Sequence, residues 1–297
     1  THRKTPVKNL QTVDKHPAEQ TLLAVKGSKD VDISEVTLGQ KTQSISNTDL
    51  NGRYLPYQSL ARTSAQEQQA KYQPNGEHIA FISDRTGTDQ IWLWRDGEIS
   101  PLSQNDNSNK IKNFTWSPDG QKLAWVSNDQ LHIGELDGKI ISEPFSTPLF
   151  DLLSWFNEHQ LLVLIHDPEP RGLYLLNLKQ KTLKPLQVNH IESAWVHQQQ
   201  LFYSTTTGDV FTRPLNEENT ISRKLKQLNG KAMFLKEGII HSVDPETFML
   251  AQYNLEGQLI KSVEQLKATA WKISDLRGNK LLLDQFVAIN QEIIELK

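Results

Sequence analysis

The chain has 297 residues, a formal net charge of −3, 37% hydrophobic and 23% charged residues, and no cysteine. This length exceeds what one ordinary core supports, whereas stacked repeats that each bury a face on a neighbour accommodate it. The composition excludes a disulfide framework, a cysteine zinc site and a thiol nucleophile, and the lack of a basic excess argues against nucleic-acid binding by this chain.

The N-terminal region contains a weak repeat and a longer connection. Val13–Val25 has a strand, Pro17 and a second strand, but Glu19 stands where a turn glycine is expected. The first and second repeats are further apart than the later ones, and the extra residues lie near Asn47–Glu67. This stretch is either a functional loop or an excursion without structure. No initiator methionine, signal peptide or run of about 18 apolar residues is visible, so we expect a processed chain or fragment with any targeting element upstream.

The clearest repeats follow. Ala70–Ser83 and Phe114–Ser127 each consist of an apolar strand, a tight turn and a second apolar strand. In the second copy the turn is Ser-Pro-Asp-Gly: Pro118 presets φ, Gly120 tolerates positive φ, and Asp119 is expected to bond its own backbone.

In the later repeats the turn motif is no longer recognisable, but large aromatic residues keep the same spacing. They recur about 40 residues apart at Trp116, Trp155, Trp195, Phe234 and Trp271, each followed by short apolar strands. Four strands per period predict an all-β propeller of about seven blades in one domain covering 1–297. The alternative is a β-sandwich with chance spacing. The predicted blades are 11–46, 69–104, 111–146, 150–187, 191–226, 230–264, and 268–297 together with 6–10. The anchors, expected to pack between blades, are Trp116, Pro118, Asp119, Gly120, Trp155, Trp195 and Trp271.

The last repeat stops after its third strand, Glu292–Leu296. We predict that Pro6–Leu10 supplies the outer strand of the last blade and closes the ring, which would remove an exposed edge. The alternative is that this segment is a frayed linker.

No nucleophile elbow, phosphate-binding loop or zinc-protease motif is present. Loops between second and third strands are the best candidates for ligand or partner binding, because they share one rim. The candidates are Asp84, Arg85 and Asp89 in one loop and His166, Asp167 and Arg171 in another. An Arg85–Asp89 ion pair that only stiffens its loop is the alternative, and His166 beside Asp167 is a possible pH sensor.

We expect no metal, no cofactor and no catalytic residue. A propeller enzyme would need inward carboxylates around the channel. The innermost positions are too neutral to bind Ca²⁺ well. They are Lys71, Asn113, Ser154, Ala194, Met233 and Ala270.

The strings Trp116–Ser127 and Pro74–Leu93 resemble the TolB-type propeller repeat, strongly over residues 70–140 and only by period elsewhere. The resemblance implies a propeller and specifies function poorly. A propeller-only chain of this kind is similar to the periplasmic sensor of CadC/ToxR-like transcriptional regulators. In those proteins, DNA binding and the membrane link belong to segments upstream of the sensor. The expected function is therefore non-enzymatic sensing of an unknown protein or small-molecule signal in the Gram-negative periplasm, with a soluble TolB-like scaffold that binds envelope proteins as the alternative.

Overall fold

The computed structural model describes most of the chain, and the fold follows from those residues. The described residues are 10–15, 22–39, 57–61, 63, 65–104, 110–143, 145, 147–165, 172–217, 220–226, 228, 232–266 and 270–296. Of these, the side chains of 10–15, 22–30, 270–271 and 287–296 are not described.

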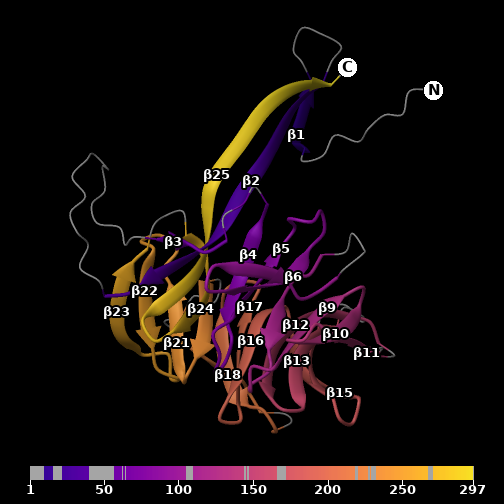
Figure 1. The fold of residues 1–297 in the computed structure, drawn as a ribbon. Coiled ribbons are helices and arrows are strands. Elements are labelled where there is room, and N and C mark those ends of the chain that lie inside the picture. The colour runs from indigo at the N-terminus through magenta and orange to yellow at the C-terminus, as the bar shows by residue number, and fades with distance from the viewer. Residues whose placement is uncertain are drawn as a thin grey trace.

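Six antiparallel sheets form a ring, and the described residues include no α-helix. Five sheets are consecutive in the chain (Figure 1). Blade 1 is β4 (Glu67–Tyr72), β5 (Ile79–Ser83), β6 (Gln90–Arg95) and β7 (Glu98–Pro101). Blade 2 is β8 (Phe114–Trp116), β9 (Lys122–Ser127), β10 (Gln130–Glu135) and β11 (Ile140–Glu143). Blade 3 is β12 (Leu149–Asn157), β13 (Gln160–Ile165), β14 (Gly172–Asn177) and β15 (Thr182–Asn189). Blade 4 is β16 (Ile191–His197), β17 (Gln200–Thr205), β18 (Val210–Pro214) and β19 (Arg223–Lys224). Blade 5 is β20 (Met233–Lys236), β21 (Ile239–Val243), β22 (Met249–Tyr253) and β23 (Leu259–Gln265).

Blade 6 combines both ends of the chain. Its strands, from the inside outward, are β24 (Ala270–Arg277), β25 (Lys280–Leu296), β2 (Leu22–Thr37) and β3 (Gln58–Ser59). The N-terminal strand β2 therefore closes the ring by pairing with the C-terminal strand, with Val36 opposite Leu281 and Ile33 opposite Asp284.

The all-β propeller is confirmed, but the prediction of about seven blades is wrong, because there are six. The described residues of the stretch 11–46, read as a first blade, supply one strand to the ring, β2. The prediction that Pro6–Leu10 closes the last blade is also wrong in its choice of strand. Residues 6–9 lie outside the described part of the chain, and Leu10 pairs with Lys26, away from the ring. The physical reason is burial: Ile33 and Val36 of β2 enter two different cores of the ring, one on each side of blade 6.

The ring is held by one hydrophobic cluster at each blade interface. Strand β13 shows the rule, because it is apolar at every position from Leu161 to Ile165. Leu161, Val163 and Ile165 pack towards blade 2, and Leu162 and Leu164 pack towards blade 4. A strand buried on both faces needs no polar alternation, since successive side chains serve opposite neighbours.

The aromatic anchors occupy these interfaces where their side chains are described. Trp116 packs between blades 1 and 2, and Trp155 between blades 2 and 3. Trp195 is half-buried against the clusters on both sides of blade 5. The Trp271 side chain is not among those described. Pro118 and Asp119 are exposed in the turn, whereas Gly120 is buried against blade 1.

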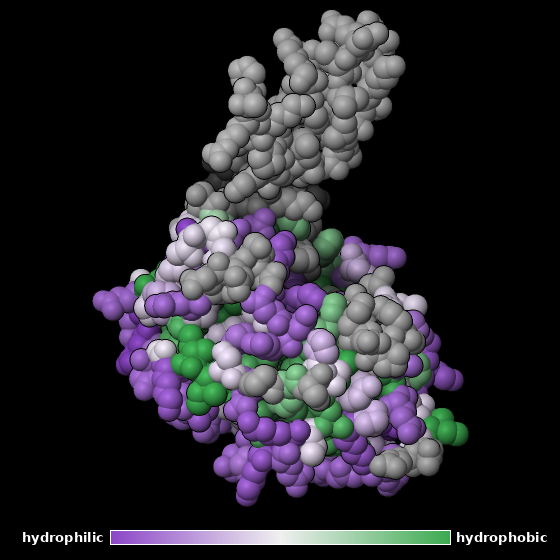
Figure 2. Space-filling view, turned by 90° about the vertical axis from the view of Figure 1, so that its right-hand side faces the viewer, coloured by the Kyte–Doolittle hydropathy of each residue, from purple (hydrophilic) through white to green (hydrophobic). Residues whose placement is uncertain are grey.

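An arm projects from the ring beyond blade 6 (Figure 1). The pairing of β2 with β25 continues past a bulge at Asp30/Val31 to Leu22 opposite Leu296. Strand β1 (Leu10–Lys15) pairs with the outer part of β2 as a third strand. Below the arm, hydrophilic side chains cover most of the visible surface and apolar residues form separate spots (Figure 2).

Candidate functional site

The arm and the β5–β6 loop lie on the same face of the ring. The turn between β24 and β25 marks the opposite face, because β25 runs from that turn towards the arm. Inner strands therefore begin on the arm face. Asp84 belongs to this face, since its carboxylate accepts a hydrogen bond from the Gln66 amide, just before β4, at 2.9 Å.

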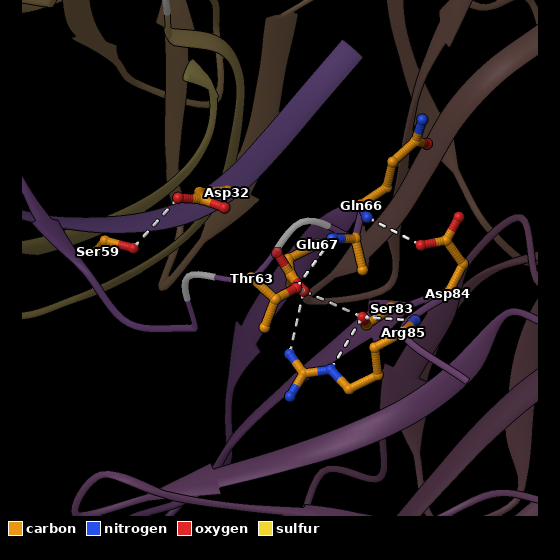
Figure 3. A network of polar contacts seen from close by, with 9 residues as sticks. Asp32, Ser59, Thr63, Gln66, Glu67, Ser83, Asp84 and Arg85 are labelled. Carbon is orange, nitrogen blue, oxygen red and sulfur yellow. Dashed lines mark hydrogen bonds and ion pairs between the residues drawn. The ribbon is translucent and has the colours of Figure 1, made fainter. Parts of the chain in front are cut away.

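The side chain of the predicted loop residue Arg85 is directed into blade 1. Its Nη2 pairs with Glu67 Oε1 at 3.1 Å, and its Nε donates to Ser83 Oγ at 3.1 Å (Figure 3). The guanidinium also lies over the Trp92 ring, 4.7 Å from its centroid. Arg85 is therefore a packing residue of blade 1, and its ionic partner is Glu67 and not Asp89.

Glu67 is the centre of this network. Its side chain is fully buried, and it accepts hydrogen bonds from Thr63 Oγ1 at 2.5 Å and Ser83 Oγ at 3.2 Å. Burial raises the pKa of Glu67 to about 7, although Thr63, Arg85 and Ser83 oppose the shift and Asp32 adds to it. The residue types near position 67 did not indicate a buried carboxylate, because its partners come from strand β5 and from the segments before β4 and after β5.

The other two predicted residues of this loop, Asp84 and Asp89, accept hydrogen bonds from backbone groups. Asp89 accepts a hydrogen bond from the Ile111 backbone, and burial raises its pKa. His166, Asp167 and Arg171 lie outside the described residues, so their predicted role stays a prediction. Among the described residues, no three histidine, aspartate or glutamate side chains are grouped so that they could hold a metal ion.

A cavity of about 110 Å³ lies in the central channel. The innermost strands of all six blades, or residues adjoining them, contribute to its wall. The lining residues are Gln69, Lys71, Asn113, Leu153, Ser193, Ala194, Trp195, Met233, Phe234, Lys272, Ile273 and Ser274. Four of the six innermost positions named from the sequence line it: Lys71, Asn113, Ala194 and Met233.

Two lysines face this cavity. Lys71 is half-buried, and its Nζ donates to Asn113 Oδ1 at 3.0 Å and to the Phe114 carbonyl. Burial lowers the pKa of Lys71 to about 8, and the charge of Lys272 lowers it further while Asp275 and Asp151 oppose the shift. Lys272 is exposed, and no described residue forms a hydrogen bond or ion pair with it.

The carboxylates near the channel accept hydrogen bonds from other donors, while Asp284 Oδ2 is buried without a hydrogen-bond partner among the described residues. Asp284 accepts from the Gln69 amide and from Ser274 Oγ, each at 2.9 Å. Asp151 accepts from the Leu152 amide at 2.7 Å. Burial raises the pKa of each of these two carboxylates to about 6.

Asp275 lies buried in β24 and joins three blades. Its carboxylate accepts from the Tyr72 amide of blade 1 at 3.0 Å and from the Leu276 amide at 2.8 Å, and it pairs with Lys236 Nζ of blade 5 at 3.0 Å.

A second, larger hollow of about 680 Å³ lies between blades 2 and 3, beside the turn that contains Pro118. Ile133, Ile141, Trp155 and Leu178 give it apolar walls. Its charged residues include Lys122, which pairs with Glu135, and Glu143, which pairs with Lys181. The hollow therefore presents no free charge at those two positions.

Comparisons with known proteins agree on the fold. No family model matches the sequence, and no curated protein matches it. Solved structures do: a putative TolB from Agrobacterium tumefaciens has a TM-score of 0.59 at 9% identity, covering 88% of this chain and 99% of that one. TolB from Acinetobacter baumannii has a TM-score of 0.52 at 11% identity, and the match covers 86% of this chain and 64% of that one. A chain of a nidogen/laminin complex has a TM-score of 0.55 at 9% identity, and the match covers 78% of this chain and 92% of that one.

These similarities show a TolB-like β-propeller fold, and identities this low show no more than the fold. In the part of the chain that the structure describes, there is no helix with the length and apolarity to cross a membrane.

Proposed function

We propose that this chain is a non-enzymatic scaffold that binds another protein, in the Gram-negative periplasm, through the face that carries the arm. The TolB-like fold supports this proposal, because propellers present loops and strand edges on a rigid ring. The observation that carries it is the edge of β25 in the arm.

That edge has the properties of an acceptor for another strand. From Ala288 to Leu296, β25 pairs with β2 on one side, and on its other side no described strand pairs with it. The sequence from 281 to 296 contains no proline, glycine, lysine or arginine. Natural edge strands are normally blunted by such residues, and an unblunted edge accepts an extended segment of another chain through main-chain hydrogen bonds. Because Glu292 and Glu295 are the charged residues between Ala288 and Leu296, we expect a partner segment that carries basic residues.

The non-enzymatic part of the proposal is supported by the channel. In propeller enzymes of the lactonase kind, inward carboxylates would hold Ca²⁺, whereas Lys71 and Lys272 face this cavity and repel a cation. The more specific expectation of a regulator's sensor has no observation in its favour beyond the repeat resemblance, and it stays a prediction.

The proposal is tested by site-specific photo-crosslinking in the cells that make the protein. A photoreactive residue is placed at Gln291 in the arm, and a matched one at Gln121 in the exposed β8–β9 turn of the opposite face. We expect one defined protein adduct from position 291 that is missing from position 121. Equal labelling at both positions, or no protein adduct at 291, would contradict the proposal.

A further inference from the structure

The central channel contains two ammonium groups that lack an anionic partner. Among the described residues, no carboxylate forms an ion pair with Lys71 or Lys272, although three carboxylates lie close enough to influence their charge. Those three are held by backbone amides, by Ser274 or by Lys236, as described above. The neutral partners of Lys71 satisfy its donors without compensating its charge.

A half-buried ammonium without a counter-ion is unfavourable, and a second cation beside it adds repulsion. Lys272 lines the same cavity as Lys71 and lies close enough to lower its pKa. Holding both ammonium groups in the folded ring is therefore electrostatically unfavourable, and a bound anion would remove this unfavourable energy.

Donors remain available around the cavity. Lys272 has all three of its protons free of described partners, and Ser193 Oγ, from the inner strand of blade 4, likewise has no described partner. Lys71 enters from blade 1 and Lys272 from blade 6. Asn113, by contrast, is occupied, because its amide donates to the Leu152 carbonyl and its oxygen accepts from Lys71.

The cavity volume limits the ligand. A space of about 110 Å³ is a few times the volume of one water molecule and below the range of drug-sized ligand pockets. It accommodates a single oxyanion group. Ammonium and hydroxyl donors suit the oxygens of a carboxylate or a phosphate, whose hydrogen bonds to charged donors are the strong ones.

We propose that the channel binds one oxyanion, a carboxylate or phosphate group, between Lys71, Lys272 and Ser193. The site is separate from the arm and does not depend on the proposed protein partner. The group belongs either to a small free molecule or to an acidic side chain of a bound protein, and the probes below distinguish these sources.

The test is calorimetric titration of the whole chain at constant ionic strength with inorganic phosphate, with succinate and with a short glutamate-containing peptide. The variants are Lys272→Met, Ser193→Ala and, as a matched control, Lys139→Met, an exposed lysine in the β10–β11 turn. Lys272 is exposed, so its variant is expected to fold like the wild-type protein.

We expect saturable binding of at least one probe, weakened about tenfold by Lys272→Met because a charge-assisted hydrogen bond is lost, weakened less by Ser193→Ala, and unchanged by Lys139→Met. Binding of phosphate or succinate assigns a free small anion, whereas binding of the peptide alone assigns an acidic segment of a protein. Both support the site.

A second readout is the titration of Lys71 by NMR, with and without the bound probe. The charged groups that act on it are Lys272, Lys236, Asp275, Asp151 and Asp284. Its pKa of about 8 is expected to rise on binding, and affinity is expected to fall as the pH passes 8. No saturable binding, or binding that Lys272→Met and Lys139→Met affect equally, would overturn the proposal.

Discussion

At the scale of single residues, Gly120 shows how one blade is fitted against the next. Its φ is +73°, and a Cβ at this position would lie 2.0 Å from the Pro74 carbonyl oxygen of blade 1. Gln73 Nε2 also donates to the Gly120 carbonyl at 2.8 Å. The turn glycine is therefore required twice, by its own backbone and by the neighbouring turn.

We expect Gly120→Ala to lower the free energy of unfolding by about 3 kcal/mol, since the left-handed backbone and the overlap with Pro74 both cost energy. The matched control is Gly138→Ala, where φ is +89° and no atom lies within 4 Å of the added Cβ. That variant should lose only about 1–2 kcal/mol. Urea denaturation of both measures the difference, and equal losses would refute the role of the close approach.

Glu67 predicts a pH dependence of stability. Its pKa is about 7 in the folded protein and 4.5 when unperturbed, so its favourable contribution is complete below pH 4.5 and is lost as the pH rises through 7. Relative to Glu67→Gln, wild-type stability should fall by about 2–3 kcal/mol between pH 4.5 and 8. Urea denaturation across this range measures it.

The contributions of other titrating groups, such as His241, to the pH dependence of stability cancel, because the wild-type protein and Glu67→Gln both contain them. Glu256→Gln, an exposed carboxylate in the β22–β23 turn, serves as the control and should follow the wild-type curve. If Glu67→Gln also follows that curve, Glu67 does not titrate as described.

At the scale of elements, the arm consists of strands whose two edges differ. Successive backbone N–H groups of a strand point to opposite sides, so in β25 one of each consecutive pair faces β2 and the other faces the free edge. Proline removes an N–H and is tolerated only on the free edge.

We therefore expect Gln291→Pro and Glu292→Pro to behave differently. One should leave hydrogen exchange in 22–30 of β2 unchanged, and the other should speed it, because it breaks a bond between the two strands. Each variant is the control for the other. Equal effects on exchange would mean that the two sides of β25 are not distinguished as the pairing requires.

The elements also show what a sequence can and cannot predict. The turns and strands around Trp116 were predictable, because proline, glycine and apolar alternation act within a few residues. The partner of β2 was not, since a strand pattern does not encode pairing with Lys280–Phe286 more than two hundred residues later. The Lys71–Lys272 channel was missed for the same reason, because only the folded ring brings these two residues together. The Glu67–Arg85 pair is local to blade 1, and it was missed because the residue pattern does not show that Glu67 is buried.

At the scale of the whole molecule, the closure of blade 6 decides where everything else lies. Pairing of β2 with β25 completes the sixth interface, brings Glu35 within 2.8 Å of Lys280 and within 2.7 Å of the Tyr72 hydroxyl, and continues into the arm. Both proposals depend on this arrangement, because it places the arm on one face of the ring and Lys272 beside Lys71.

The most direct test of that arrangement is an engineered disulfide between β2 and β25. Thr37 and Lys280 are register partners, and the chain contains no cysteine of its own. In the variant with Thr37→Cys and Lys280→Cys, we expect complete crosslinking on mild oxidation, read as a shift in non-reducing electrophoresis and loss of free thiols. A control with Thr37→Cys and Lys139→Cys, which lie on blades 6 and 2, should keep its thiols. Free thiols in the Thr37–Lys280 variant would contradict the six-bladed ring closed by the N-terminal strand.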